Sequence, residues 1–356
     1  MTRTVASKRP PSRRHRAGHA VARVLSGLAA MAVVAVLAWG GIRYLHFTRT
    51  PLQVRVAGQT TEIARGEGFK DIVAQLRRER LTGASPLLWR ALAWRMGVVN
   101  KLHAGEYALA PGMTPRVLLE DMAAGRVVHH RVTLVDGWTF AQVRQALAVA
   151  PRLKHELGAL GDAAVMAKLD GKPGSPEGEF MPDTYDYVLG MSDLDILARA
   201  HETLQAFLSK EWAARDTSIP LQAPYQALIL ASLVEKETAV PAERPEIAGV
   251  FERRLKIGMK LETDPSVIYG MGASYDGKIH KSNLETDTPY NTYTRYGLPP
   301  TPIALPSRAA IHAVLHPAAG DALYFVAKGD GTHAFSATLA EQNAAIRKYI
   351  LGKQRK

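Results

Sequence analysis

The chain has 356 residues, which is enough for two domains with a hydrophobic core. It contains no cysteine, which excludes a cysteine nucleophile and a cysteine-based zinc site and fits an oxidising compartment without structural disulfides. The formal net charge is +12, but residues 1–23 hold seven Lys and Arg and no acid, so the rest carries only about +5. Without a glycine-rich phosphate loop or a basic stripe with interleaved aromatics, nothing indicates a nucleic-acid partner.

The apolar segment at residues 24–42, VLSGLAAMAVVAVLAWGGI, contains no charged residue. Nineteen helical residues span about 28 Å, close to the hydrocarbon thickness of a bilayer. The run is longer than the roughly 7–15 apolar residues of a signal peptide and no small-residue cleavage site closes it, so we expect an uncleaved anchor over 24–45 rather than a signal peptide. The basic tail 1–23 predicts a single-pass inner-membrane protein with a cytoplasmic N-terminus and a periplasmic remainder.

Residues 50–128 are expected to form a small separate module. The stretch 52–57 alternates apolar and polar residues, which is typical of a half-buried strand. Two amphipathic helices follow, the second opening with Ser85 as N-cap and Pro86 at the first helical position, and LHAGEYAL is typical of a strand. The order strand, helix, helix, strand resembles a glycan-binding LysM-like module, although many small α+β domains share it.

Residues 129–356 are predicted to form a mixed α+β domain, so the expected fold class is α+β. A strand over 127–135, a turn at Asp136-Gly137 and a helix opened by a Thr139/Gln142 capping box come first. The Gly/Pro-rich stretch 171–187 is typical of an ordered loop. Helices are expected over 192–214 and 223–238, and the irregular chain past residue 260 is typical of functional loops.

The stretch LILASLVEKETAV places Glu235 and Glu237 at the end of an apolar helix. Residues two apart on a helix point about 200° away from each other, so the two carboxylates cannot share one site. Burial raises a carboxyl pKa, and a glutamate tuned toward about 6–7 can donate and recover a proton. The alternative is that both acids end the helix as charges paired with Lys236, Arg244 or Arg253.

Several segments resemble the YceG/MltG family, the membrane-anchored endolytic murein transglycosylases. The resemblance is carried by VEKETA, TDPSVIYG, YNTY…GLPP, Ala104-Gly105-Glu106-Tyr107 and PDTY at 182–185, and it extends over nearly the whole exported chain. This chain departs from the family pattern with TPIALPS at 301–307, with Asp136-Gly137 in place of Glu-Gly, and with Glu341-Gln342-Asn343 near the end. The departures fall in these loops, whereas the Glu-Lys-Glu-Thr element is intact.

The resemblance implies that Glu237, the second Glu of the Glu-Lys-Glu-Thr element, is the catalytic acid of a lyase. This lyase cleaves the β-1,4 bond from N-acetylmuramic acid to N-acetylglucosamine within glycan strands, leaves 1,6-anhydro ends and terminates nascent glycan elongation. Glu237 would protonate the leaving oxygen and then accept the proton of the muramoyl C6 hydroxyl. The implied partners are peptidoglycan glycan strands, the plasma membrane and peptidoglycan synthases.

Further candidates for contacts with the sugar are Asp264, Tyr290, Asn291 and Tyr293, which offer hydrogen bonds and stacking surfaces. Each has a structural alternative, because Asp264-Pro265 also suits an Asx turn and the tyrosines also suit a core. Glu235 completes the set, and we expect it to orient the helix by pairing with a basic side chain.

No cofactor or metal is expected from the sequence. The adjacent His129 and His130 face opposite sides of a strand, and we expect His316 and His333 to be hydrogen-bonded loop histidines. Two other functions stay open. One is a hydrolase that uses Glu243, Glu262 or Asp264 as a second carboxylate, and the other is a non-catalytic glycan-binding scaffold of cell-wall synthesis.

Overall fold

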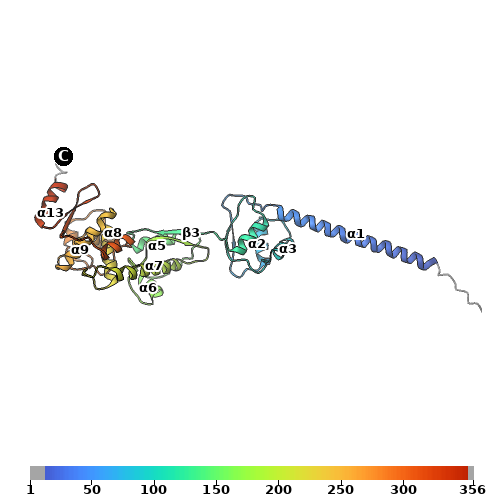
Figure 1. The fold of residues 1–356 in the computed structure, drawn as a ribbon, viewed down its shortest axis with the longest axis horizontal. Helices are drawn as coiled ribbons and strands as arrows, with labels where there is room; N and C mark the ends of the chain where they lie inside the picture. Colours follow the sequence, from blue (N-terminus) through green and yellow to red (C-terminus); the bar gives the residue numbers. More distant parts are fainter. Residues whose placement is uncertain (1–12, 352–356) are drawn as a thin grey trace, which may run out of the picture. The chain divides into compact units, whose positions relative to one another are not determined.

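The computed structural model describes residues 13–351, and the chain divides into two compact units, residues 1–128 and 129–356. The first unit begins with the helix α1 (Arg13–Arg49), drawn in blue in Figure 1. Its part Arg23–Arg49 has a mean hydropathy of 2.0 and is, by length and composition, able to cross a membrane. Apolar side chains such as Leu25, Val34 and Leu37 lie exposed along it, as expected of a helix that contacts lipid.

A small α+β module follows α1 in the first unit. Its elements are β1 (Thr60–Ile63), α2 (Phe69–Arg78), α3 (Pro86–Met96), β2 (Gly105–Ala108) and α4 (Pro115–Ala124). The strands β1 and β2 pair antiparallel with Ile63 opposite Gly105, and the helices bury Leu76, Trp89 and Leu118 against one another. Phe47 near the end of α1 packs edge-on against Trp89, so the apolar helix and the module share a core.

The predicted strand at 52–57 is wrong, and the first strand lies at β1 instead. The backbone N–H of Leu52 donates to the carbonyl of Met113, and that of Gln53 donates to the carbonyl of Leu81. These acceptors lie in two separate loops, so no single neighbouring strand is available to form a ladder. The alternation of the sequence reflects the burial of Leu52 rather than a sheet.

The second unit contains two adjoining cores. The first is built from β3 (His130–Leu134), α5 (Phe140–Ala148), η1 (Leu157–Ala159), α6 (Asp162–Asp170), β4 (Asp183–Tyr187) and α7 (Asp193–Ala214). The strands β3 and β4 pair antiparallel with Val132 opposite Tyr185. The stretch 171–187, predicted as a loop, therefore ends in a strand, because its alternating aromatic residues Tyr185 and Tyr187 are buried.

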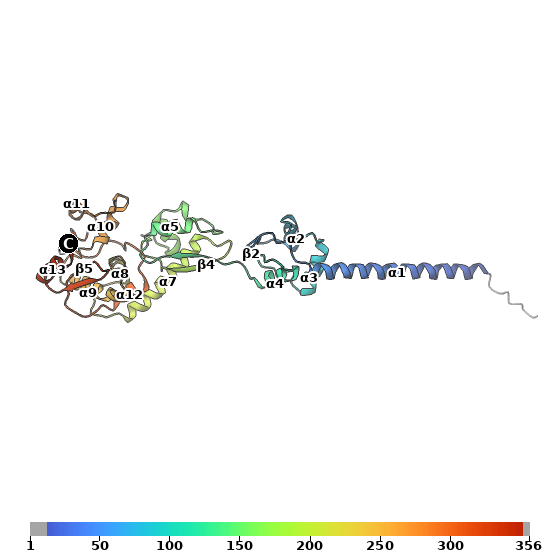
Figure 2. The same ribbon diagram turned by 90° about the horizontal axis from the view of Figure 1, so that it is seen from above.

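The second core is centred on α8 (Pro224–Glu237), which packs against α9 (Arg244–Lys256) and α12 (Arg308–Leu315), as Figure 2 shows. The chain past residue 260 is less irregular than predicted, because it forms several short elements. They are α10 (Asp264–Met271), η3 (Gly272–Ser274), α11 (Lys281–Glu285), β5 (Tyr324–Ala327), β6 (His333–Ser336), α13 (Leu339–Ile346) and η4 (Arg347–Leu351), while η2 (Pro241–Glu243) links α8 to α9.

Buried acids in this unit make its stability depend on pH. Burial raises the pKa of Glu252 to about 8 and those of Glu177 and Glu179 to about 7. Among the described residues, none donates a hydrogen bond to Glu252 Oε1. Between about pH 4.5 and 8 the folded state binds protons that the unfolded chain releases, so the free energy of unfolding falls as pH rises through this window.

We expect Glu252→Gln to flatten this dependence, because the amide needs no proton to stay neutral. The free energy of unfolding from urea titrations should drop less between pH 5 and pH 9 in the variant than in the unchanged chain. Glu246→Gln, on the same helix but partly exposed, is the matched control. An equal drop in all three proteins would show that Glu252 is not protonated in the fold.

Candidate active site

The helix α8 carries the two glutamates to its C-terminal end. Pro224 opens it, and all eight residues from 227 to 234 are buried, so the helix runs through the core of the second unit. It ends at Glu237, because Thr238 adopts an extended conformation and Pro241 follows. The boundaries agree with the predicted 223–238 to within one residue at each end.

The carboxylate of Glu237 faces the start of α10. The hydroxyl of Thr263 donates a hydrogen bond to Glu237 Oε2 at 2.7 Å. Thr263 is the N-cap residue of α10, yet its side chain makes no capping bond to its own helix. The hydroxyl that would ordinarily accept from that helix is instead directed at the glutamate.

A cluster of buried hydroxyls fixes Thr263 in place. Thr292 Oγ1 accepts from the Thr263 N–H at 3.0 Å and lies 2.8 Å from the hydroxyl of Ser266, which donates to the Thr263 carbonyl at 2.8 Å. All three residues are almost fully buried. Because satisfied buried networks are rigid, this cluster holds the donor to Glu237 in one position.

The surroundings of Glu237 raise the pKa of its carboxyl group. Burial is the largest cause, and the neighbouring negative charge of Asp264 acts in the same direction. The Thr263 hydrogen bond opposes the shift, together with the more distant charges of His333 and Arg254. A carboxyl group of this kind is protonated closer to neutral pH than an exposed glutamate, as a general acid requires.

We expect Thr263→Val to raise the pKa of Glu237 further, because it removes a hydrogen bond that favours the carboxylate. If Glu237 must be protonated to act, the alkaline limb of the pH–rate profile then moves to higher pH. Thr263→Ser keeps the hydroxyl and serves as the control. An unmoved alkaline limb in a folded Thr263→Val variant would contradict the assignment of that limb to Glu237.

Glu235 has a different set of partners, as the helical geometry predicts. Arg244 Nη2 lies 3.1 Å from Glu235 Oε1, and the two side chains are only 13% and 6% exposed. The backbone N–H of Ser307 donates to Glu235 Oε2 at 3.1 Å, and the Ser307 hydroxyl donates to the same oxygen. The expected pairing of Glu235 with a basic side chain is therefore confirmed, and it ties α8 to the starts of α9 and α12.

Two of the departures from the family pattern lie beside Glu235. The turn Asp136-Gly137 packs on the end of α8, where Lys236 Nζ donates to the Gly137 carbonyl at 3.3 Å. Burial and the charge of Glu235 raise the pKa of Asp136. Ser307, the last residue of TPIALPS, supplies the hydroxyl on the other side. These two departures therefore lie at Glu235 and its neighbour Lys236, not at Glu237.

The four remaining candidates fall into two groups. Tyr293 donates its hydroxyl to Asp264 Oδ1 at 2.6 Å, and burial together with this bond raises the pKa of Tyr293. This pair lies at the start of α10, next to Thr263. The Asn291 side chain is buried and donates to three backbone carbonyls at the end of α11. Tyr290 packs on Tyr269 and bonds to Thr301. The side chains of Asn291 and Tyr290 therefore stabilise the loop that carries them.

The other carboxylates considered as second catalytic groups are held by basic partners. Glu243 accepts from both the backbone N–H and the ring Nδ1 of His333 at 2.8 Å, and these bonds outweigh burial and lower the pKa of Glu243. Glu262 pairs with Arg254 at 3.6 Å. His333 is hydrogen-bonded as expected, although it begins a strand and not a loop.

A cavity of about 250 Å³ adjoins the hydroxyl cluster. It is lined by residues between 289 and 300, including Thr292 and Tyr296. Lys260 Nζ lies 5.3 Å from the centre of the Tyr296 ring, which is largely exposed. An exposed aromatic ring beside a polar cavity is a surface on which a sugar ring can stack.

The sequence did not predict Thr263 as the partner of Glu237, Thr292 as the partner of Thr263, or Ser307 as a partner of Glu235. These contacts join positions 26 to 72 residues apart in the chain, so no local sequence pattern predicts them. A usable signal existed only for Thr263, since a threonine directly before Asp-Pro is placed to begin a helix.

The fold and the site together define a two-unit α+β protein with an apolar N-terminal helix and a glutamate of raised pKa at the end of a buried helix. The sequence profile of the YceG-like family matches residues 61–348. The chain belongs to this family.

Curated relatives agree with this assignment. The protein of Bacillus subtilis (strain 168) named Endolytic murein transglycosylase is 32% identical over 276 residues, covering 71% of this chain and 75% of that protein. The protein of the same name from Streptococcus pneumoniae serotype 2 (strain D39) is 26% identical over 357 residues, covering 87% of this chain and 61% of that protein. A crystal structure of a yceG-like protein from Listeria monocytogenes is 27% identical, with a TM-score of 0.49 over 82% of this chain and 99% of that one.

Proposed function

We propose that the chain is an endolytic murein transglycosylase, a lyase that cuts the β-1,4 bond from N-acetylmuramic acid to N-acetylglucosamine within peptidoglycan strands. The observation that carries the proposal is the carboxyl group of Glu237, whose pKa is raised by burial at the end of α8. The family of this chain and the name of its relatives indicate peptidoglycan as the substrate.

The mechanism uses one carboxyl group twice. Protonated Glu237 gives its proton to the glycosidic oxygen as the bond to the anomeric carbon breaks and oxocarbenium character develops there. The resulting carboxylate accepts the proton of the muramoyl C6 hydroxyl as that oxygen bonds to the anomeric carbon. The products are a 1,6-anhydro end and a free N-acetylglucosamine hydroxyl, and the glutamate is protonated again.

Thr263 suits this cycle, because its hydroxyl stabilises the carboxylate that exists between the two proton transfers. We propose that Asp264, Tyr293 and the exposed Tyr296 contact the sugars, while Asn291 and Tyr290 hold the loop that carries them.

The experiment that tests the reaction is mass spectrometry of the fragments released from purified murein by the full chain in detergent. Anhydro ends are expected, and reducing ends would favour a hydrolase with Asp264 as second carboxylate.

We propose that residues 24–45 anchor the enzyme in the inner membrane, that tail 1–23 is cytoplasmic and that 129–356 acts in the periplasm. The apolar helix and the basic tail support this topology. An enzyme held at the membrane meets glycan strands while synthases extend them, so cleavage there would terminate nascent strands. Peptidoglycan synthases are the partners this role implies.

We propose that residues 50–128 form a LysM-like module that holds glycan. On α3 the ring of Trp94 is 79% exposed and lines a cavity of about 420 Å³ with Leu87 and Asn100. We expect Trp94→Ala to weaken co-sedimentation with murein roughly 2–10-fold, the worth of one stacked ring. Val56→Ala, another exposed apolar residue of this unit, is the control. Unchanged co-sedimentation of the Trp94→Ala variant would remove the binding role of this face.

A further inference from the structure

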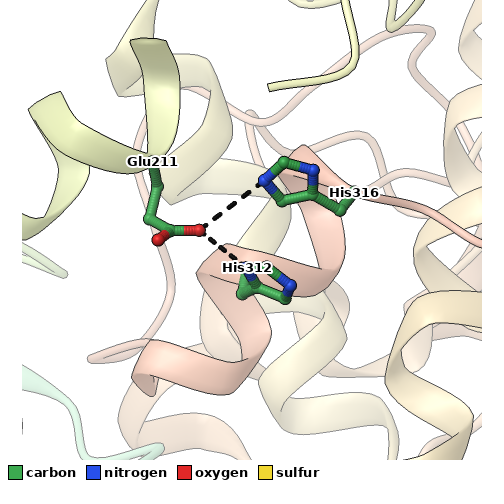
Figure 3. A group of neighbouring side chains, drawn as sticks. All are labelled: Glu211, His312 and His316. Carbon is green, nitrogen blue, oxygen red and sulfur yellow. Dashed lines mark hydrogen bonds and ion pairs between the residues drawn. The ribbon is translucent and has the colours of Figure 1, made fainter. Parts of the chain in front are cut away.

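Three side chains that could bind a metal ion meet at the C-terminal ends of α7 and α12. His312 lies on α12 and His316 directly follows the end of that helix, and their ring centres are 4.5 Å apart. Glu211 reaches both rings from α7 (Figure 3). Glu211 Oε2 is 2.6 Å from His312 Nδ1 and 3.7 Å from His316 Nε2. One ligand atom from each of the three residues lies within 4.8 Å of the other two.

We propose that Glu211, His312 and His316 bind a divalent transition-metal ion of the zinc class. Two imidazoles and one carboxylate form a donor set that suits zinc, and zinc sites with three protein ligands complete a tetrahedron with water. The proposal adds a site that the sequence analysis did not expect, and it is independent of the reaction assigned to Glu237.

The distances are close to those of an occupied site. Ligand bonds of about 2.0–2.2 Å at tetrahedral angles place donor atoms about 3.3 Å apart. The contact of Glu211 with His312 is a hydrogen bond and is shorter than this separation, and the contact with His316 is slightly longer. Small rotations of these side chains would bring all three donor atoms within bonding distance of one ion.

The burial of the three groups fits a metal site with an entry path. The carboxylate of Glu211 is 14% exposed, whereas His316 is 32% and His312 is 60% exposed. The acid is therefore held within the fold, and the open side at His312 admits an ion and a water ligand. A further carboxylate, that of Asp216, lies near His316. Hydrogen bonds from Ser218 lower the pKa of Asp216, and the electrostatic effects of Lys256 and His316 act in the same direction.

An ion at this position would fasten α12 to α7. The backbone N–H of Asp216, just after α7, already donates to the carbonyl of Leu315 at 2.9 Å. At the other end of α12, the N-cap residue Ser307 donates a hydrogen bond to Glu235 on α8. The ion would therefore stiffen α12, whose N-cap Ser307 contacts Glu235.

The test uses zinc alone as the probe on the full chain in detergent, stripped with chelator beforehand. We expect the unchanged chain to bind one more zinc ion than the His312→Ala variant by calorimetry. Glu211→Gln should weaken this binding at least about tenfold, because it removes the third ligand while keeping the shape of the side chain. Saturating zinc, at about 100 times the dissociation constant, should raise Tm of the unchanged chain by roughly 5–10 °C.

The matched control is His155→Ala, which removes an exposed histidine of the same unit and should leave zinc binding unchanged. Circular dichroism confirms that each variant is folded. Equal zinc affinity in the Glu211→Gln variant and the unchanged chain would reduce the site to a two-histidine chelate and overturn the proposal. Equal losses in the His312→Ala and His155→Ala variants, or an unmoved Tm, would also overturn it.

Discussion

Glu237→Gln should lower the rate of anhydro-muramoyl product formation by at least about 10²–10⁴-fold, the usual loss when a general acid–base is removed. The amide keeps the size of the side chain and can still accept the Thr263 hydrogen bond, but it has no proton to transfer. Because the proposed mechanism uses the same group in both proton transfers, we expect the loss at the upper end of this range. The rate is measured by quantifying anhydro ends from purified murein.

Glu235→Gln is the matched control, because it makes the same chemical change two residues away on the same helix. Its expected effect is a loss of stability with a milder loss of rate, since the side chain contacts Arg244 and Ser307. Circular dichroism separates unfolding from loss of chemistry. Wild-type turnover by a folded Glu237→Gln variant, or an inactive Glu235→Gln variant beside an active Glu237→Gln variant, would show that the roles are assigned wrongly.

Arg244→Met should destabilise the second unit by roughly 3–5 kcal/mol, the usual cost of leaving one partner of a buried ion pair uncompensated. Glu235 retains the donors of Ser307 in this variant, so we expect the lower end of the range. Urea unfolding of the full chain in detergent measures the change.

The double variant Glu235→Met/Arg244→Met tests whether the effect belongs to the pair. Replacing both charges with apolar side chains of similar length should cost less than the two single changes added together. The exposed pair Arg116–Glu120, on α4 in the other unit, is the control, and Arg116→Met should change stability by less than about 1 kcal/mol. If the two buried changes are simply additive, Glu235 and Arg244 do not stabilise the fold as a pair.

Local patterns in the sequence predicted the elements that carry the site. The helix α8 was placed to within one residue because a proline opens it, an apolar run fills it and a second proline follows it. The strand at 52–57 was misplaced because an alternating pattern does not show whether a partner strand is present, and here only Leu52 of its apolar residues is buried. The short elements past residue 260 were underestimated because each spans only a few residues.

The site was predicted in part. The separation of Glu235 and Glu237 follows from helical geometry alone, and Arg244 was one of three basic residues within reach of Glu235. The sequence did not select Arg244, since its position depends on the turn η2, and it did not reveal the hydroxyl cluster around Thr263. The pair His312 and His316 is readable as a four-residue spacing, but Glu211 lies about a hundred residues earlier.

The central claim is that one glutamate and the C6 hydroxyl of the substrate carry the whole reaction, so water is not consumed. The most direct measurement is mass spectrometry of the fragments that the full chain releases from murein in water enriched in heavy oxygen. We expect 1,6-anhydro ends without label, and we expect the Glu237→Gln variant to form almost none of them. Reducing ends that carry the heavy oxygen would contradict it, because that product requires water to attack the anomeric carbon.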